Sequence, residues 1–551
     1  MDRREDVLNQ PPPLLDYNVF TSDAALVEAF AREAPGQAPR QLVELGSLAG
    51  GQDAQTWGRL ANEYPPRLRA YDRFGRRIDE VEFHPAYHEL MRAGMEYGLH
   101  AAPWAGAEAN AHLLRAVKFY VWAQVEAGHG CPLSMTYAAV PALRAQPLLA
   151  AAWEPHLTSP AYDPELRARE TKLGATCGMA MTEKQGGSDV RANSTRARFL
   201  ESGPFGDQYS LNGHKWFCSA PMSDAFLVLA QAPAGLTCFF VPRVLEDGTR
   251  NRFCIARLKE KLGNRSNASA EIELDETIGV RVGEEGRGVH TIVEMVNFTR
   301  LDCINGSAAL MRQACAQAVH HATYRHAFGK ALIDQPLMQN VLADLALESE
   351  AAVVLLLRIA RAVDESQTDP AAGIVKRLGT AVGKYYICKR APAAVAEALE
   401  TLGGNGYVEE SILPRLYREA PLNSIWEGSG SVNALDVLRI FAKDDRAADA
   451  LRAEIAPALD DARMREAAGS LFAQVRGGTP DAAARDVAER IALLWQAALL
   501  LAARSDAADL FVETRIAGRW GRTLGTLPHS AALGRIARRA SPGELVEYSS
   551  T

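Results

Sequence analysis

The sequence lacks the features that mark several common protein classes. Its eight cysteines include no Cys-x-x-Cys pair, which argues against a zinc site or a disulfide framework and favours a reducing compartment. The first 20 residues have no apolar core of the kind that a signal peptide needs. The longest apolar run, residues 491–503, contains Gln496 and is too short to span a bilayer. We therefore expect a cytoplasmic protein without membrane segments or a bound metal.

The chain also lacks a strong excess of charge of either sign. The formal net charge of its 551 residues is −7 at pH 7, so any attraction to nucleic acid or anionic lipid has to be local. There is no internal repeat, and no low-complexity tract apart from an enrichment in alanine. A content of 48% hydrophobic and 23% charged residues is ordinary for a globular chain of several domains.

The spacing of apolar residues changes twice along the chain. Residues 1–20, with the triple proline Pro11 to Pro13, are expected to form an extended arm, and residues 21–173 have the periodicity of helices. Residues 174–285 alternate in the manner of strands, and Asn212-Gly213 predicts a hairpin turn because both positions of a type I′ turn need positive φ. The expected strands include 177–182, 209–217, 226–230, 236–241 and 270–274.

Helical periodicity returns after a glycine-rich segment that ends at Gly288. Four long helices, joined by short links, predict an antiparallel bundle over residues 286–444. Residues 445–551 are rich in Ala and Arg and form a further helical domain, with a break at 477–480. The fold class is therefore α+β with several domains. The expected bundle helices are 289–327, 335–366, 370–402 and 430–444.

One octapeptide, Asn423 to Gly430, suggests catalysis. Ile425 and Trp426 precede Glu427 and would shield it from water, and a desolvated carboxylate is a stronger base at neutral pH. The glycines and serines that follow allow the backbone to approach a flat ligand. The alternative interpretation is a capping loop with a solvated glutamate.

Three motifs upstream favour the functional interpretation. In the first, residues 181–189, glycine amides and the hydroxyls of Thr182 and Ser188 could hold a polar group; such segments are often only turns. In the second, Trp216 at a strand end could cover an aromatic cofactor, or simply pack on the sheet. In the third, Arg325 and Phe328 suit a phosphate and a planar ring, although Gly329 there is also typical of a helix end.

The four motifs occur in one order along a helix–strand–helix chain, and in this the chain resembles the acyl-CoA dehydrogenase superfamily. The resemblance covers about residues 80–440. It implies an N-terminal helical domain, a central β-barrel-like domain, a C-terminal four-helix bundle and FAD as cofactor. It also implies a homotetramer, a dimer of dimers, in which the ADP half of FAD is held by a neighbouring subunit.

The same resemblance implies the roles of individual residues. Glu427 would be the catalytic base, and Arg439, twelve residues later, could pair with it and weaken it. Residues 403–406 would hold the ADP half together with Arg325, Phe328 and Gln335. The implied cofactor-binding residues are Met179, Met181, Thr182, Gly187, Ser188, Trp216, Phe217, Cys218, Ser219, Arg325, Phe328, Gln335, Gly403, Gly404, Ile425, Trp426, Gly428, Ser429 and Ser431.

Within the superfamily the chain is most similar to the AidB branch, bacterial flavoproteins of the adaptive response to DNA alkylation. The segments at 181–189, 261–269, 414–419 and 423–430 carry this likeness, and so do the opening Asn9-Gln10-Pro11-Pro12 and the tail beyond residue 445. Asn297 stands where ordinary members have Asp, and Glu400 where they have Gln. These departures weaken the case for ordinary CoA-thioester chemistry more than the case for flavin.

The C-terminal tail has a local excess of arginine. Between Thr514 and Ala540 there are six Arg and no Asp or Glu. Their spacing predicts two stripes on helix faces, and guanidinium groups bind phosphate well. A solvated or salt-bridged face is the alternative, but the AidB resemblance implies double-stranded DNA as the partner, with little sequence preference. The predicted DNA-binding residues are Arg515, Arg519, Arg522, Arg535, Arg538 and Arg539.

Three functions follow from these patterns. The first is an FAD-containing acyl-CoA dehydrogenase-like protein that binds double-stranded DNA in the response to alkylation and has weak, isovaleryl-CoA-like dehydrogenase activity. The second is an ordinary metabolic dehydrogenase of short or branched acyl-CoA whose C-terminal extension serves assembly. The third is a DNA-shielding protein in which flavin is only a structural ligand. The first is the preferred hypothesis.

Overall fold

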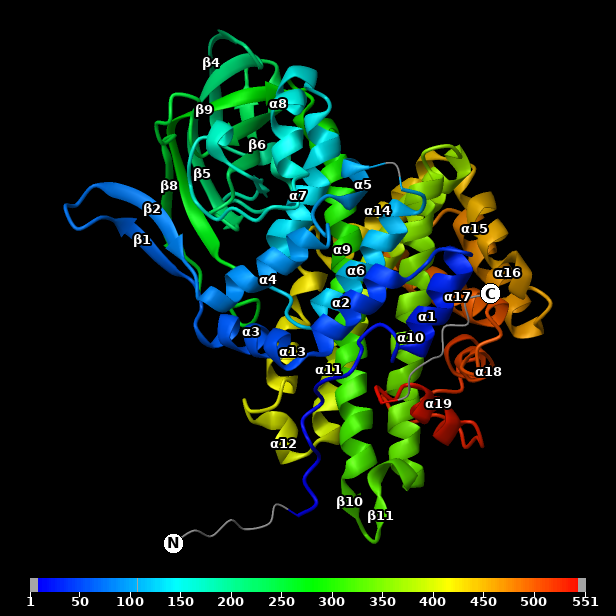
Figure 1. The fold of residues 1–551 in the computed structure, drawn as a ribbon. Helices are drawn as coiled ribbons and strands as arrows, with labels where there is room; N and C mark the ends of the chain where they lie inside the picture. Colours follow the sequence, from blue (N-terminus) through cyan, green and yellow to red (C-terminus); the bar gives the residue numbers. More distant parts are fainter. Residues whose placement is uncertain (1–7, 107, 544–551) are drawn as a thin grey trace, which may run out of the picture. The chain divides into compact units, whose positions relative to one another are not determined.

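The elements follow the predicted order of helices, strands and helices (Figure 1). The computed structural model describes residues 8–106 and 108–543. The N-terminal part contains α1 (Ala24–Glu33), α2 (Arg40–Gly50), α3 (Gln52–Glu63), β1 (Arg67–Tyr71), β2 (Arg77–Glu82), α4 (Pro85–Glu96), α5 (Ala102–Ala105), α6 (Ala111–Ala123), α7 (Gly130–Leu143) and α8 (Pro147–Leu157).

The β1–β2 hairpin corrects the expectation that residues 21–173 are entirely helical. Pro65 and Pro66 end the preceding helical stretch, and the hairpin turn contains Gly75 at φ +79°. Asp72 stabilises the turn, because its Oδ1 accepts hydrogen bonds from the backbone amides of Phe74 and Arg76 at 2.8 and 2.9 Å. An Asp side chain that bonds the backbone in this way is a turn signal that the helical periodicity on either side obscured.

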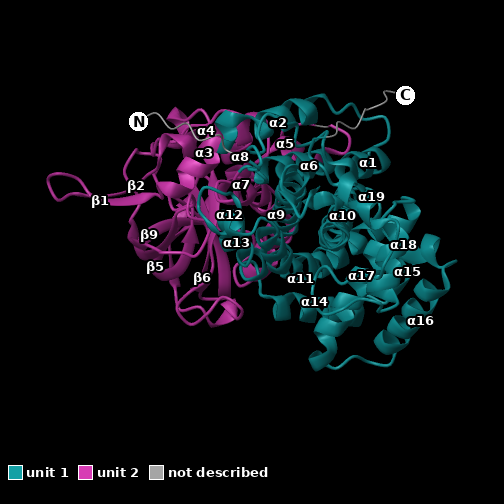
Figure 2. Ribbon diagram, turned by 90° about the horizontal axis from the view of Figure 1, so that it is seen from below, with its two compact units in different colours: residues 1–55, 112–125, 303–551 teal, residues 56–111, 126–302 magenta. Residues whose placement is uncertain are grey.

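The chain divides into two compact units, which Figure 2 distinguishes by colour. The first unit contains residues 1–55, 112–125 and 303–551, and the second contains residues 56–111 and 126–302. These units do not coincide with the domains expected from the sequence, because the N-terminal helical segment contributes to both. In the described ranges, no helix combines the length and the apolar character needed to cross a membrane.

The β domain of the second unit is a closed sheet. Strands β6, β4, β5, β9 and β7 pair in that order, and β7 also pairs with β6, which completes a ring; β3 joins β6 and β8 joins β9. The aromatic core inside it includes Tyr209, Phe226, Phe239 and Phe253. The strands are β3 (Cys177–Ala180), β4 (Arg196–Gly203), β5 (Gly206–Ser219), β6 (Ala225–Ala232), β7 (Gly235–Pro242), β8 (Phe253–Leu258) and β9 (Ser269–Val282).

The hairpin predicted at Asn212-Gly213 is wrong. Strand β5 continues through both residues, and its turn with β4 lies at Gly203–Gly206. Gly213 instead occupies a bulge against β9, at φ +156°. A Cβ at this position would lie 2.5 Å from Oγ1 of Thr195 and 2.7 Å from its Cα. The glycine is therefore required by close backbone packing, which is the other common reason for glycine in a strand.

The predicted bundle helices are confirmed to within three residues at each end. They are α9 (Gly288–Tyr324), α10 (Pro336–Glu365), α11 (Pro370–Thr401) and α14 (Gly430–Lys443). Helices α10 and α11 both begin at a proline, where the missing amide costs nothing. The short hairpin β10 (His326–Ala327) and β11 (Lys330–Ala331) links α9 to α10, and α12 (Gly404–Tyr407) and α13 (Leu413–Glu419) follow α11.

The C-terminal residues form helices that pack on this bundle. Helix α17 lies against α10, α11 and α14, and α19 lies against α10. The break predicted at 477–480 separates α16 from α17. The elements are α15 (Ala447–Ile455), α16 (Ala462–Arg476), α17 (Ala484–Ala502), α18 (Ala508–Phe511), a π-helical turn η7 (Val512–Ile516) and α19 (Leu533–Arg539).

Candidate functional site

Two of the predicted motifs meet at the ends of strands in the second unit. The backbone amide of Trp216 donates a 2.8 Å hydrogen bond to the carbonyl of Thr182. A buried ion pair joins their neighbours, with 2.7 Å between Nζ of Lys215 and Oε1 of Glu183. A Cβ at Gly187 would lie 2.5 Å from Oγ1 of Thr182, so only glycine allows the turn to fold back on this threonine. The sequence motifs thus form one strand-end cluster.

Glu183 and Lys215 hold this cluster together and were not among the predicted site residues. Both side chains are fully buried. Burial alone raises the pKa of Glu183, but Lys215, with hydrogen bonds from Ser194 and Thr195, outweighs it and lowers the pKa to about 2. Burial lowers the pKa of Lys215. Glu183 directly follows the predicted strand 177–182 and Lys215 lies within the predicted strand 209–217, which was the signal that the sequence offered for this pair.

The aromatic residues of the cluster lie partly open to solvent. Nζ of Lys259 lies 3.6 Å from the ring centroid of Trp216 and 4.5 Å from that of Phe217. The pairing of β5 with β9 shifts in register between Lys215 and Cys218. Phe217, within this irregular segment, is 50% exposed. Cys218 instead faces the core of the β domain, so its side chain is not presented to a ligand. Gly187 and Ser188 are exposed, whereas Met181, Thr182, Trp216 and Ser219 are half-buried and Met179 is buried.

The residues predicted to hold the ADP half lie together at one end of the bundle in the first unit. Phe328 forms the turn between β10 and β11 and is 98% exposed. Nε2 of Gln335 donates a 2.8 Å bond to the carbonyl of Ala327, which fixes this hairpin. Gly403, at φ +60°, would have open space around a Cβ. The guanidinium of Arg325 and an accessible glycine backbone are donors that suit a pyrophosphate, so this set fits FAD.

Two buried polar side chains of the first unit donate hydrogen bonds to backbone carbonyls of the loop that carries Glu427. Nζ of Lys384 donates to the carbonyls of Asn423 and Gly428 at 2.6 and 3.1 Å. Nδ2 of Asn433 donates to the carbonyls of Gly428 and Ser429 at 2.7 and 3.0 Å. Glu427 itself is half-buried and has φ +58°. Non-glycine residues in this conformation cost about 1–3 kcal/mol and concentrate at functional sites.

Ile425 and Trp426 were expected to shield Glu427 from water, and the exposure of Ile425 contradicts this for its side chain. Ile425 is 63% exposed, and Trp426 is half-buried with its indole Nε1 donating to Oδ1 of Asn423 at 2.9 Å. Arg439 is exposed on α14, and its pairing with Glu427 stays a prediction. The Oγ of Ser431 accepts a 2.9 Å bond from Arg485. Lys384 and Asn433 were missed because nothing in their local sequence distinguishes them from ordinary helix residues.

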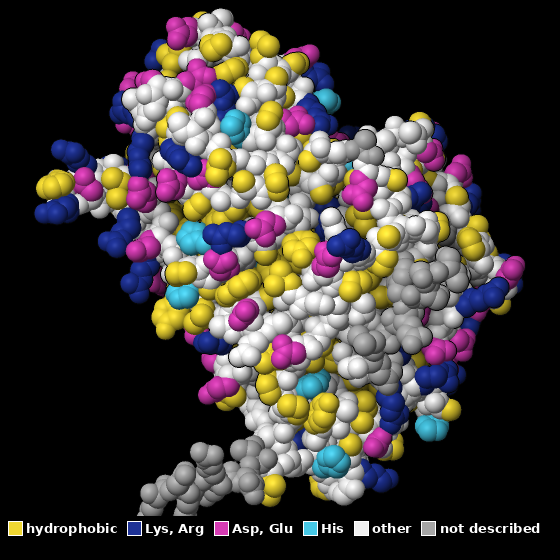
Figure 3. Space-filling view, viewed as in Figure 1, with side chains coloured by type: hydrophobic (Ala, Val, Ile, Leu, Met, Phe, Trp, Pro, Cys, Tyr) yellow, Lys and Arg dark blue, Asp and Glu magenta, His cyan; other side chains and the backbone are white. Residues whose placement is uncertain are grey.

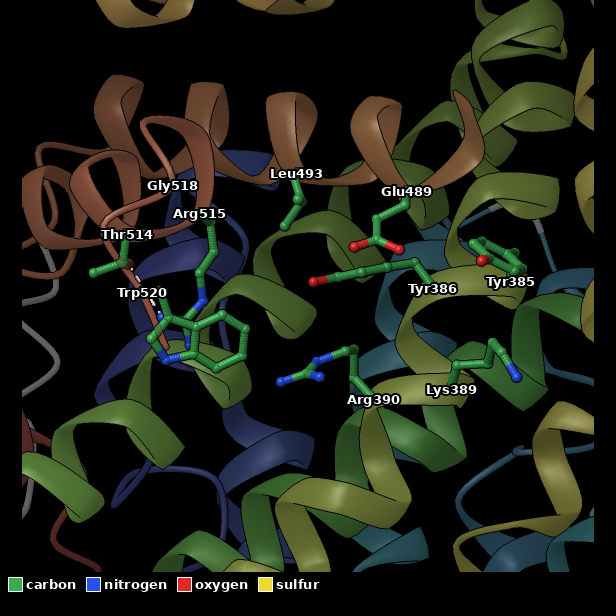
Figure 4. Close-up of a pocket in the computed structure, with 10 residues that line it drawn as sticks. All are labelled: Tyr385, Tyr386, Lys389, Arg390, Glu489, Leu493, Thr514, Arg515, Gly518 and Trp520. Atoms are coloured by element: carbon green, nitrogen blue, oxygen red, sulfur yellow. Dashed lines mark hydrogen bonds between the residues drawn. The ribbon is translucent and has the colours of Figure 1, made fainter. Parts of the chain in front are cut away.

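The structure contradicts the assignment of Arg515 to a DNA-binding surface. Its side chain is 1% exposed and forms ion pairs with Asp344 and Glu348. It also lies over the ring of Trp520, 3.9 Å from the centroid, at the side of a cavity of about 390 Å³ (Figure 4). The expected helical stripe fails because η7 ends at Ile516 and residues 517–532 are not helical. Arg515 therefore supports the interior, where an unpaired charge would be costly.

Most of the other tail arginines are paired with carboxylates of the same unit. Arg519 pairs with Glu513 at 2.6 Å, Arg535 with Asp506 at 2.9 Å, Arg538 with Asp334 at 2.5 Å and Arg539 with Glu28 at 2.6 Å, while Arg522 is exposed. Figure 3 shows basic and acidic side chains mixed over the C-terminal helices. The excess of arginine in this segment is thus largely balanced by acids from other segments.

Comparison with known proteins agrees with this architecture. The model of the adaptive response protein AidB N-terminal domain matches residues 9–164, the acyl-CoA dehydrogenase middle domain matches 178–277, and the acyl-CoA dehydrogenase C-terminal domain matches 286–441. The chain is 51% identical to the acyl-CoA dehydrogenase-type protein AidB of Escherichia coli, over 79% of this chain and 80% of that protein.

Two comparisons concern Caenorhabditis elegans. Acyl-CoA dehydrogenase family member 11 of this organism is 31% identical, over 90% of this chain and 86% of that protein. A solved structure of a C. elegans acyl-CoA dehydrogenase in complex with C11-CoA superimposes with a TM-score of 0.82 at 27% identity, and covers 99% of this chain and 94% of that one. FAD is the usual cofactor of this family. The chain therefore belongs to the acyl-CoA dehydrogenase family, in its AidB branch, and is an FAD-dependent oxidoreductase of the acyl-CoA dehydrogenase type.

Proposed function

We propose that the protein oxidises the α,β carbon–carbon bond of an acyl thioester, with Glu427 as the base. The observation that carries this proposal is the strained, half-buried glutamate on a loop held by Lys384 and Asn433. Four hydrogen bonds from these two side chains fix the loop carbonyls on either side of Glu427. A base positioned in this way contributes about 10²–10⁴-fold to a proton transfer.

The step balances as a two-electron oxidation of the substrate. The carboxylate of Glu427 takes the α-proton, and the electrons of that C–H bond form the new C=C bond as the β-carbon loses hydride. FAD, when bound, supplies the chemistry that accepts this hydride. We propose that the strand-end cluster of Thr182, Ser188 and Trp216 binds the flavin ring, since it offers two hydroxyls and a half-buried aromatic ring.

The substrate class is supported by the C. elegans structure with C11-CoA. We propose acyl-CoA esters, with isovaleryl-CoA-like compounds among them, and weak turnover. Asn297 in place of the aspartate of ordinary members is the residue change that supports weak rather than rapid CoA-thioester chemistry. Pairing of Arg439 with Glu427 would lower the activity further, because a carboxylate held by a guanidinium is a poorer base.

The test of the catalytic proposal is Glu427→Gln, measured in steady-state turnover of short and branched acyl-CoA esters with an artificial electron acceptor. We expect kcat to fall at least about 100-fold, with the FAD content unchanged because the amide is isosteric. Glu410→Gln, on an exposed glutamate of the same region, is the control and should retain wild-type turnover. Equal turnover of wild type and Glu427→Gln would contradict the assignment.

We propose, second, that the protein binds double-stranded DNA in a response to alkylation damage. The support is the 51% identity to AidB, together with four arginines of the tail that remain exposed: Arg519, Arg522, Arg535 and Arg538. Three of them have carboxylate partners, which phosphate would have to replace. We therefore expect moderate affinity, dominated by phosphate contacts and without strong sequence preference.

The DNA proposal is tested by the salt dependence of binding to a duplex. In the variant with Arg519, Arg522, Arg535 and Arg538 all changed to Ala, the log–log slope should become shallower by about 0.9 for each phosphate that is no longer neutralised. Arg40→Ala, on an exposed arginine of α2, should keep the wild-type slope. An unchanged slope in the quadruple variant would exclude the tail, and wild-type protein that binds no duplex would favour the metabolic dehydrogenase.

We propose, third, a homotetramer in a reducing, cytoplasmic compartment. Large apolar side chains exposed at the end of the bundle support an assembly, since exposed apolar surface often marks an interface: Tyr324 at 50%, Phe328 at 98%, Leu337 at 76%, Tyr407 at 81% and Val408 at 47% exposure. All eight cysteines are free thiols, which supports the reducing compartment.

A further inference from the structure

The N-terminal arm crosses the end of the bundle where Arg325 and Gly403 lie. Figure 1 shows the first described residues of the chain running between α12 and the β10–β11 hairpin. These three segments, which begin at positions 8, 326 and 404 of the sequence, belong to the same compact unit. None of the roles assigned above to cofactor binding, catalysis or DNA contact uses the arm.

Asn9 is bonded to the Arg325–His326 segment through three hydrogen bonds. Its Nδ2 donates to the carbonyl of His326 at 2.8 Å, and its Oδ1 accepts from the amide of His326 at 2.8 Å. A guanidinium nitrogen of Arg325 donates to the backbone carbonyl of Asn9. Asn9 has φ +57°, a conformation that asparagine tolerates better than most residues. The side chain therefore pairs with both backbone groups of His326, as a neighbouring strand would.

Gln10 connects the arm to the glycine loop. Its Oε1 accepts a 2.9 Å hydrogen bond from Nδ2 of Asn405, which lies two residues after Gly403. Further along, the ring of His320 is hydrogen-bonded to the carbonyl of Pro12 at 2.8 Å, and the proline run keeps the arm extended. Two adjacent residues thus join Arg325 to the loop that contains Gly403 and Gly404.

We propose that Asn9 and Gln10 are positioning residues for the ADP half of FAD. The proposal rests on the FAD-dependent function proposed above and on the expectation, from the family resemblance, that this end of the bundle holds the ADP half for a neighbouring subunit. Phe328 and the Gly403 turn are exposed, so neither is fixed by packing against its own unit. Gln335 fixes the hairpin within itself, and the arm adds a link between the two loops, because Asn9 is bonded to Arg325 and His326 and Gln10 is bonded to Asn405. Pre-ordering of two loops saves the entropy that the cofactor would otherwise lose in ordering them.

Because of where Asn9 and Gln10 lie, their loss should change the affinity for FAD without changing the rate of the chemical step. Asn9 and Gln10 touch neither the Glu427 loop nor the acyl-CoA in this proposal. Their loss should raise the dissociation constant of FAD and leave kcat at saturating FAD within about twofold. Each replacement removes a small number of exposed hydrogen bonds, so about a tenfold change in FAD affinity is expected for each alanine variant.

The test compares full-length variants from which FAD has been removed. FAD is titrated back, and its binding is measured by the quenching of flavin fluorescence. Asn9→Ala and Gln10→Ala should each weaken FAD about tenfold. Leu8→Ala is the matched control, because this arm residue is 79% exposed. Asn405→Ala should weaken FAD as much as Gln10→Ala, and the double variant should show little additional loss.

Two readouts distinguish positioning from a general loss of stability. Thermal unfolding of the FAD-free variants should match that of the FAD-free wild type, and sedimentation should show the same assembly once FAD is saturating. Equal FAD affinity in wild type, Asn9→Ala and Gln10→Ala would overturn the proposal. A wild-type protein that takes up no FAD would instead overturn the proposed function on which it rests.

Discussion

At the scale of single residues, the ion pair of Glu183 and Lys215 is the clearest energetic feature of the strand-end cluster. Neither side chain is exposed, and Oε1 of Glu183 also accepts a 2.6 Å hydrogen bond from Thr195. Removing one partner leaves the other charge buried without compensation. We expect Lys215→Met to lower the free energy of unfolding by about 3–5 kcal/mol, measured by urea denaturation.

The control for this prediction is Lys184→Met, on the exposed lysine next to Glu183. It should change stability by less than about 0.5 kcal/mol. The double replacement Glu183→Met/Lys215→Met should recover much of the loss, because two apolar groups avoid the desolvation cost. If Lys215→Met were as stable as the wild type, the ion pair would contribute nothing to the free energy of unfolding.

The same pair predicts how stability depends on acid. The pKa of Glu183 is about 2 in the folded protein and 4.5 ordinarily. A carboxyl whose folded pKa is depressed contributes stability that is fully present above its unfolded pKa and is lost as the pH falls. The difference in unfolding free energy between wild type and Glu183→Gln should therefore shrink between pH 4.5 and pH 2, as followed by denaturant titrations at each pH.

At the scale of elements, the loop of Glu427 depends on the helices α11 and α14 beneath it. Lys384→Met would leave the carbonyls of Asn423 and Gly428 without their buried donor. A displacement of the base by about 1 Å can cost roughly 100-fold, so we expect kcat to fall by about 10- to 100-fold while FAD stays bound. Lys443→Met, on an exposed lysine at the end of α14, should have wild-type kcat. An unaltered kcat in Lys384→Met would mean that the hydrogen bonds from Lys384 are not needed to position Glu427.

The elements that the sequence predicted are those with strong local signals. The bundle helices have long apolar periodicity, α10 and α11 also begin at a proline, and the ends of all four were predicted to within three residues. The predicted turn at Asn212-Gly213 was wrong because Gly213 is needed for its close approach to Thr195. Thr195 directly precedes β4, and no local sequence pattern around Gly213 reports this contact. The β1–β2 hairpin was missed because two short strands lie between long helices.

At the scale of the whole molecule, charge is balanced between distant segments. Arg515, Arg535, Arg538 and Arg539 find their carboxylates on other elements, and Asp344, Asp334 and Glu28 are more than 150 positions away from the arginines they bind. A count of charges in a window of the sequence could not detect this. The motifs at Thr182 and Trp216, by contrast, were expected at one site, and the structure joins them by a backbone hydrogen bond; their roles toward flavin and thioester stay predictions.

The most direct measurement of the central claim is the anaerobic reduction of the bound flavin by acyl-CoA, followed by its absorbance. Wild-type protein should lose its flavin absorbance on mixing with a short or branched acyl-CoA, slowly if the activity is weak. Glu427→Gln should bind the same amount of FAD and lose its absorbance at least about 100-fold more slowly. Flavin that is reduced equally fast in both proteins, or by no acyl-CoA in the wild type, would contradict the assignment of Glu427 as the base of an acyl-CoA dehydrogenase.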